Sequence, residues 1–229
     1  MHTPAKTEAA CWSCHAPHAG GHFCAACGKI QPLPRGADYF AFFGLSQKLW
    51  LDCAALERLF HQLSWKLHPD NFVRASEYER ELSLERGSQL NDAYRTLRDP
   101  VARVEYLLAQ AGMRKEGAAK QQAPPELLEE VFELNESLDE LRAARRADGA
   151  EMGVLIERLE AEEKKFESRL CEVDEELKRV AAEWDAALDA GGEDSKRKEL
   201  MVRMNDVLNR RSYIRNLVAN VQKELAEAQ

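Results

Sequence analysis

The chain has 229 residues, of which 45% are hydrophobic and 31% charged, a composition typical of a folded protein rich in long helices. The formal net charge is −8, which argues against duplex nucleic acid as the main partner, because binding to phosphates requires clustered basic residues. No apolar run approaches the ~20 residues needed to cross a bilayer, so an integral membrane protein is not expected. The opening segment MHTPAKTEAA contains neither the apolar stretch of a secretory signal nor the arginines of a transit peptide.

Composition divides the chain into four parts. The first is rich in cysteine, histidine and glycine and shows no helical period, and the second predicts a compact set of helices. The third, polar and made of small residues, predicts a linker. The fourth contains three apolar seams with the 4–3 spacing that favours a bundle of near-parallel helices. We therefore expect an all-α chain, with a small module on residues 1–37, a helical domain on 38–111, a linker on 112–125 and an elongated three-helix bundle on 126–229.

Capping residues predict where the helices of residues 38–111 begin. An aspartate or serine that can accept hydrogen bonds from a first helical turn precedes each of four apolar periodic segments. The second segment should stop near Leu67, because Pro69 disfavours a helical conformation at the residue before it. We expect Trp50, Trp65 and Trp184 to lie in the core rather than at a binding site. The predicted caps are Asp38, Asp52, Ser76 (in a capping box with Glu79) and Asp99.

Four of the six cysteines form two Cys-x-x-Cys hooks separated by nine residues. The two intervening residues of each hook allow both sulfurs to reach one ion from a tight turn, and four thiolates complete the tetrahedron that Zn2+ prefers. Such a small segment has little to bury, so metal binding would supply much of its folding free energy. We therefore predict one structural Zn2+ held by Cys11, Cys14, Cys24 and Cys27.

Other interpretations of the cysteines stay open. An iron site of the rubredoxin type uses the same four ligands. The run from Cys11 to His15 matches the C-x-x-C-H pattern of c-type haem attachment, although haem would leave the second hook unexplained. A redox dithiol would normally belong to a βαβ fold, and the sequence predicts no strands. Cys53 and Cys171, which lie outside the hooks, are expected to be inert core or surface thiols.

A His-Pro-Asp tripeptide, His68 to Asp70, lies in the turn between two predicted helices. Alone it is a weak signal, because proline and aspartate are ordinary turn residues. Its setting, after Asp38-Tyr39-Phe40 and before Asn91-Asp92-Ala93-Tyr94, resembles the J domain of DnaJ-type co-chaperones over residues 38–98.

The chain is more narrowly similar to the HscB family, the J-type co-chaperones of iron–sulfur cluster biogenesis. The supporting motifs are His68-Pro69-Asp70-Asn71-Phe72, Asp99-Pro100-x-x-Arg103-x-x-Tyr106, and the run from Leu127 to Leu138. The four-cysteine module resembles the animal mitochondrial members of that family.

This resemblance implies that residues 38–111 dock on a DnaK-type ATPase chaperone and stimulate its ATP hydrolysis, and that the protein itself is not an enzyme. The fixed φ of Pro69 favours a preformed turn, and the carboxylate of Asp70 suits a partner arginine. The expected docking residues are His68, Pro69 and Asp70, with Lys66, Arg58 and Arg74 as a basic helix face.

The first helix of the bundle contains more apolar residues than its seam requires. Leu128 and Phe132 lie one turn apart beside the seam, within a rim of glutamates, and a solvent-facing phenylalanine in such a rim suggests a partner surface. In the HscB family this helix binds the scaffold protein on which iron–sulfur clusters are assembled. The resemblance implies a scaffold-binding set of Leu128, Phe132, Glu133, Glu136 and Glu140, with Tyr213 on the last helix.

The expected function is therefore that of an adaptor that brings the scaffold to the chaperone and triggers ATP hydrolysis there. The resemblance implies the mitochondrial matrix, with the cytoplasm as the alternative, and a homodimer stays open. A general J-type co-chaperone for unfolded polypeptides and a thiol- or metal-handling protein are the two other functions that the residues allow.

Overall fold

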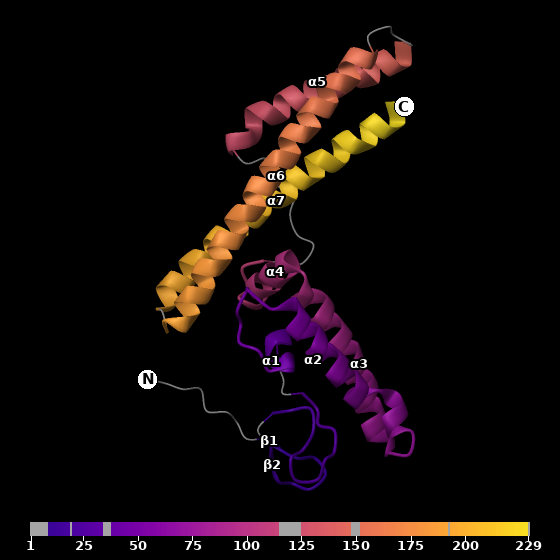
Figure 1. Ribbon diagram of the computed structural model, residues 1–229, viewed down its shortest axis with the longest axis vertical. Coiled ribbons are helices and arrows are strands. Elements are labelled where there is room, and N and C mark those ends of the chain that lie inside the picture. The colour runs from indigo at the N-terminus through magenta and orange to yellow at the C-terminus, as the bar shows by residue number, and fades with distance from the viewer. Residues whose placement is uncertain are drawn as a thin grey trace. The chain divides into compact units, whose positions relative to one another are not determined.

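The computed structural model describes residues 9–18, 20–33, 38–114, 125–147, 152–191 and 193–228 (Figure 1). The chain divides into two compact units, Met1–Arg103 and Val104–Gln229. The expected all-α class is confirmed, since every described element other than one very short ladder is helical. Most of the expected linker, residues 115–124, lies outside the described residues. No described helix combines the length and the apolarity that crossing a bilayer requires.

The N-terminal module contains the ladder. Strands β1 (Ala9–Ala10) and β2 (Pro17–His18) pair antiparallel, with Ala9 opposite His18, and a single bridge joins Phe23 to Ile30. The sequence predicted no strands, because two residues are too few to produce the alternation by which a strand is recognised. These pairings shape the loops that present the cysteines.

Helices α1 (Tyr39–Phe43), α2 (Cys53–Leu67), α3 (Glu77–Arg98) and α4 (Pro100–Gln110) follow, with a 3₁₀ turn, η1 (Pro69–Phe72), between α2 and α3. The predicted caps are confirmed: Asp38 accepts from the Ala41 N–H, Asp52 from those of Ala54 and Ala55, and Asp99 from that of Ala102. Ser76 and Glu79 form the complete capping box. Helix α2 ends at Leu67, as Pro69 requires. Leucines and phenylalanines facing inward from these helices form the core, among them Phe40, Leu56, Leu67, Leu90 and Leu97.

The prediction for two of the three tryptophans is wrong. Trp184 is buried, but Trp50 and Trp65 are 75% and 79% exposed. Leu67 marks the inward face of α2, and Trp65 is two residues away, about 200° around the helix, so its side chain projects into solvent. Trp50 directly follows the buried Leu49 on the loop before α2 and points the other way.

The second unit contains the short turn η2 (Pro125–Leu127) and three long helices, α5 (Leu128–Ala147), α6 (Met152–Asp189) and α7 (Asp194–Ala228). At 1.5 Å per residue, the 38 residues of α6 span about 57 Å. Helices α6 and α7 pair along their length and α5 packs against α6 (Figure 1). Residues of the three predicted seams are buried at the interface, among them Leu134, Leu138, Phe166, Trp184, Met204 and Ile214.

Candidate functional site

The structure brings the four predicted metal ligands together. All four Sγ atoms lie within 4.8 Å of one another, with Cys11 3.6 Å from Cys27 and Cys14 3.7 Å from Cys24. A tetrahedral ion with bonds of about 2.3 Å requires sulfurs about 3.8 Å apart. The cluster therefore fits one tetrahedral metal ion, which would neutralise the thiolates and crosslink the two hooks.

The two hooks have the same backbone conformation. The residue after each second cysteine lies in the left-handed region, His15 with φ 59° and Gly28 with φ 72°. Each of these residues donates its N–H to the carbonyl of the first cysteine, at 3.0 Å to Cys11 and 2.9 Å to Cys24. Glycine adopts this conformation without steric cost, whereas histidine does so rarely. His15 therefore adopts the positive φ that the hook requires, although residues other than glycine favour negative φ.

Hydrogen bonds to the Cys11 sulfur favour its ionised form. Burial opposes ionisation of Cys11, but the backbone N–H groups of Cys14 and Ser13 outweigh it and lower the Cys11 pKa to about 6. At Cys27 the Lys29 backbone N–H lowers the pKa, but burial and the neighbouring thiols raise it to about 12. A second thiolate beside the first is disfavoured because the two negative charges repel each other. A divalent cation bound between the sulfurs would remove this repulsion.

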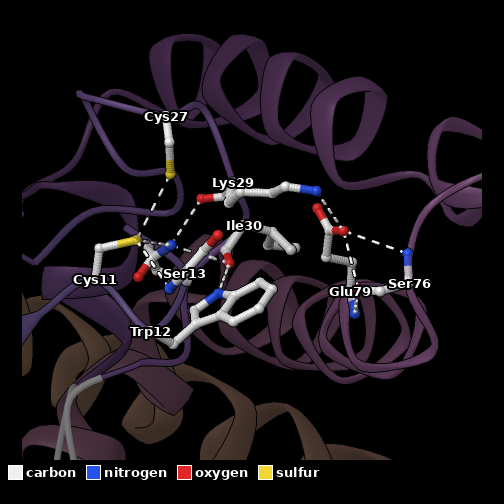
Figure 2. A network of polar contacts seen from close by, with 9 residues as sticks. Cys11, Trp12, Ser13, Cys27, Lys29, Ile30, Ser76 and Glu79 are labelled. Atoms are coloured by element: carbon white, nitrogen blue, oxygen red, sulfur yellow. Dashed lines mark hydrogen bonds and ion pairs between the residues drawn. The ribbon is translucent and has the colours of Figure 1, made fainter. Parts of the chain in front are cut away.

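The module is joined to α3 by side chains that Figure 2 displays. Lys29 Nζ lies 2.7 Å from Glu79 Oε2, the same carboxylate that closes the capping box with Ser76. Trp12 donates its indole N–H to the Ile30 carbonyl at 2.7 Å (Figure 2), and its ring packs edge-on against Tyr78, with centroids 4.9 Å apart. No sequence pattern indicated this interface, because its partners are 50 or more residues apart along the chain.

The His-Pro-Asp turn is exposed at its tip and fixed at its base. His68, Pro69 and Asp70 are all solvent-exposed. His68 Nδ1 accepts the Asp70 N–H at 3.3 Å, and the Phe72 side chain is buried beneath the turn. Because Pro69 restricts φ, the three exposed groups are presented in one conformation.

Two further hydrogen bonds hold the last turn of α2. Asn71 Nδ2 donates to the Trp65 carbonyl at 2.6 Å, and Ser83 Oγ, fully buried on α3, donates to the Leu67 carbonyl at 2.7 Å. Both carbonyls belong to the helix end, where backbone acceptors lack partners within the helix. Asn71 and Ser83 are thus positioning residues for the turn that sequence reasoning missed.

The predicted basic residues lie at different distances from the turn along the chain. Arg58 and Lys66 are exposed on α2, and Arg74 is exposed after η1. Trp65 and Lys66, with His61 and Gln62, line a shallow hollow on α2. Sequence analysis missed Trp65 as a surface residue, although its spacing from the inward leucines of α2 contained that information.

On α5, the predicted second surface is open to solvent. Leu128 is 55% exposed and Phe132 72% exposed, one turn apart on the same face, and Glu133, Glu136 and Glu140 are exposed beside them. Glu140 also pairs with Arg158 of α6 at 3.2 Å. Tyr213 lies on α7, half-buried beside the core residue Ile214.

An α2–α3 helical hairpin that presents an exposed His-Pro-Asp turn defines the class of J-type co-chaperones. No family model matches the chain. It is 35% identical over 152 residues to the co-chaperone HscB homologue of Vibrio vulnificus strain YJ016, covering 66% of this chain and 85% of that one. It is 34% identical over 140 residues to the homologue of Vibrio parahaemolyticus, covering 61% and 80%. The chain belongs to the HscB family of J-type co-chaperones.

Solved structures agree with this fold. The crystal structure of human co-chaperone HscB superimposes with a TM-score of 0.63 at 24% identity, covering 94% of this chain and 98% of that one. HscB from Vibrio cholerae superimposes with a TM-score of 0.50 at 27% identity, covering 84% and 100%.

Proposed function

We propose that this protein uses its His-Pro-Asp turn to stimulate ATP hydrolysis by a DnaK-type chaperone, to which it delivers an iron–sulfur scaffold protein. The observation that supports the first half is the turn itself, exposed at His68, Pro69 and Asp70 and fixed from beneath by Phe72. A preformed turn loses little conformational entropy on binding, and an exposed carboxylate can accept paired hydrogen bonds from a partner arginine.

A single-turnover ATPase assay with the chaperone of the same organism tests the docking proposal. Asp70→Asn removes the charge and keeps the shape of the side chain, so we expect stimulation to fall by roughly two orders of magnitude if a buried charge pair is lost. Asp206→Asn, at an exposed aspartate of α7, serves as a matched control and should stimulate normally. Full stimulation by the Asp70→Asn variant would overturn the docking assignment.

The second half is supported by the α5 surface, in which Leu128 and Phe132 lie within exposed glutamates. Exposed aromatic and aliphatic side chains of this kind are typical of binding hot spots. Affinity capture with the intact protein distinguishes the two kinds of cargo: recovery of one folded scaffold protein supports this proposal, whereas recovery of diverse unfolded polypeptides supports a general co-chaperone.

For the four-cysteine cluster we propose one structural Zn2+, because Zn2+ favours four tetrahedral ligands and thiolate sulfur. Metal analysis of the purified protein should give about one zinc per chain, and iron in its place would refute the choice of ion. We further propose the mitochondrial matrix as the compartment, on the strength of the resemblance to animal family members with this module. Cell fractionation tests that location.

A further inference from the structure

Helix α3 has a line of buried polar residues on one face. Glu79, Ser83 and Arg86 are spaced at i, i+4 and i+7, so they lie on the same side of the helix, and all three are buried. Each forms a contact outside α3: Glu79 with Lys29, Arg86 with Gln31, and Ser83 with the Leu67 carbonyl. Two of these contacts hold the four-cysteine module, and the third holds the helix end that leads into the His-Pro-Asp turn.

Arg86 depends on the module for its acceptor. Its side chain is 1% exposed, and both Nε, at 3.1 Å, and Nη2 donate to the Gln31 carbonyl. The guanidinium also lies 6.0 Å from the centroid of the Phe42 ring. Within the described residues, no carboxylate pairs with it and its Nη1 has no hydrogen-bond partner. A buried cation that loses its acceptors is strongly destabilised, so without Gln31 this side chain has to leave the interior.

Gln31 is in turn held by the cysteine cluster. Its side chain is buried, and its Nε2 donates to Cys11 Sγ at 3.3 Å and to the Lys29 carbonyl at 2.9 Å. Its backbone N–H donates to the His22 carbonyl at 2.9 Å. A metal ion held by the four cysteines would crosslink the two hooks and so fix the Cys11 sulfur that this amide contacts. The residue that receives Arg86 is therefore placed by contacts within the metal module.

We propose that the metal-loaded module positions the His-Pro-Asp turn, through Gln31, Arg86 and Ser83. With a metal ion bound, the crosslinked hooks would hold Gln31 through Cys11. The Gln31 carbonyl holds Arg86 in the interior, and the rigid α3 carries Ser83 to the Leu67 carbonyl one turn away. When the metal is removed, Gln31 loses its anchor, Arg86 moves toward water, and the contact between Ser83 and Leu67 loosens. The consequence for the chaperone rests on the proposed function, in which this turn docks the chaperone.

Amide hydrogen exchange of the full chain, with and without a zinc chelator under reducing conditions, tests this coupling directly. We expect chelation to speed exchange at residues 65–72 by roughly tenfold, since local opening of a helix end becomes easier, while exchange in α6 and α7 stays unchanged. ATPase stimulation should fall in parallel. Unchanged exchange at residues 65–72 after verified metal removal would overturn the proposal.

An Arg86→Met variant separates coupling from general destabilisation. Methionine removes the buried charge and keeps most of the side-chain length, so residues 65–72 should no longer respond to chelation. Arg103 provides the matched control, because it is also a buried arginine but donates to the Leu97 and Leu49 carbonyls of the helical region instead of the module. Arg103→Met should keep the full response.

An equal response in both variants contradicts the route through Arg86. If Arg86→Met fails to fold, Ser83→Ala gives the same test at the other end of the route, with the exchange response expected to shrink and an undiminished response contradicting the proposal. The exchange result does not depend on chaperone docking. Normal stimulation by Asp70→Asn alongside metal-dependent exchange would thus defeat the proposed function and leave the positioning intact.

Discussion

The side-chain amide of Asn71 donates a hydrogen bond to the Trp65 carbonyl at 2.6 Å, and this bond ties the exposed turn back to the helix that precedes it. The bond joins the turn to the backbone of Trp65, whose indole is also exposed.

Asn71→Ala should weaken ATPase stimulation without unfolding the protein. The substitution leaves a helix-end carbonyl to water and should cost about 1 kcal/mol of stability, and the looser turn has more conformational entropy to lose on docking. Stimulation measured at sub-saturating co-chaperone should fall about threefold, while saturating concentrations restore it. Asn216→Ala on the exposed surface of α7 is the control, and equal behaviour of the two variants would mean that the bond does not position the turn.

Trp65→Ala should weaken chaperone binding roughly tenfold, as expected when an exposed aromatic becomes buried in an interface. Trp50 offers a close control, because it belongs to the same unit and is exposed to nearly the same extent, 75% against 79%. Calorimetry with the chaperone should show the loss for Trp65→Ala and none for Trp50→Ala. A comparable loss in both variants would point to a general effect on folding.

Phe132→Ala should reduce scaffold affinity by about 2 kcal/mol, close to thirtyfold, without changing ATPase stimulation in the absence of scaffold. Val154→Ala is the matched control, since Val154 is a 69% exposed apolar residue on α6. If the scaffold binds the Phe132→Ala variant as tightly as the unmodified protein, the binding surface lies elsewhere.

The Lys29–Glu79 contact should make the attachment of the module sensitive to acid. The hydrogen bond from Lys29 lowers the pKa of Glu79 below its ordinary value of 4.5. A depressed folded-state pKa means that the contribution to stability is present above the unfolded-state pKa and is lost as the pH falls through the folded-state pKa. The Tm should therefore drop below pH 4.5.

The Glu79→Gln variant should have a lower Tm at pH 7, by an amount corresponding to about 1 kcal/mol, and a flatter Tm profile at acidic pH. Thermal unfolding followed by circular dichroism between pH 3 and pH 7 measures both effects. A variant whose acid profile matches that of the unmodified protein would show that another carboxylate is responsible.

Local chemistry was sufficient to predict much of this molecule. Asp52, Ser76 and Asp99 each begin a helix, because capping depends on only three or four neighbouring residues. Each cysteine hook is likewise local, and the presence of two hooks nine residues apart predicted the four-cysteine cluster. The position of Trp65 on α2, two residues from the buried Leu67, already places it on the outward face of the helix, although tryptophan side chains are usually buried.

Contacts between segments that are distant along the chain could not be predicted from the sequence. Arg86 occupies the place of an apolar residue in the row formed by Leu82 and Leu90, and that interruption was a visible sign of something unusual in α3. Its acceptor, the backbone carbonyl of Gln31, is 55 residues away. Any residue type has such a carbonyl, so no side-chain pattern could have identified the partner.

Because Arg86 depends on a carbonyl of the four-cysteine module, the residue at this position should differ between homologous chains with and without the module. A J-type relative that starts at the equivalent of α1 has no carbonyl there to receive a guanidinium, so we expect an uncharged side chain in the place of Arg86. Chains that possess both hooks are free to keep the arginine. Gain or loss of the module in evolution should thus be accompanied by a substitution at this one position of α3.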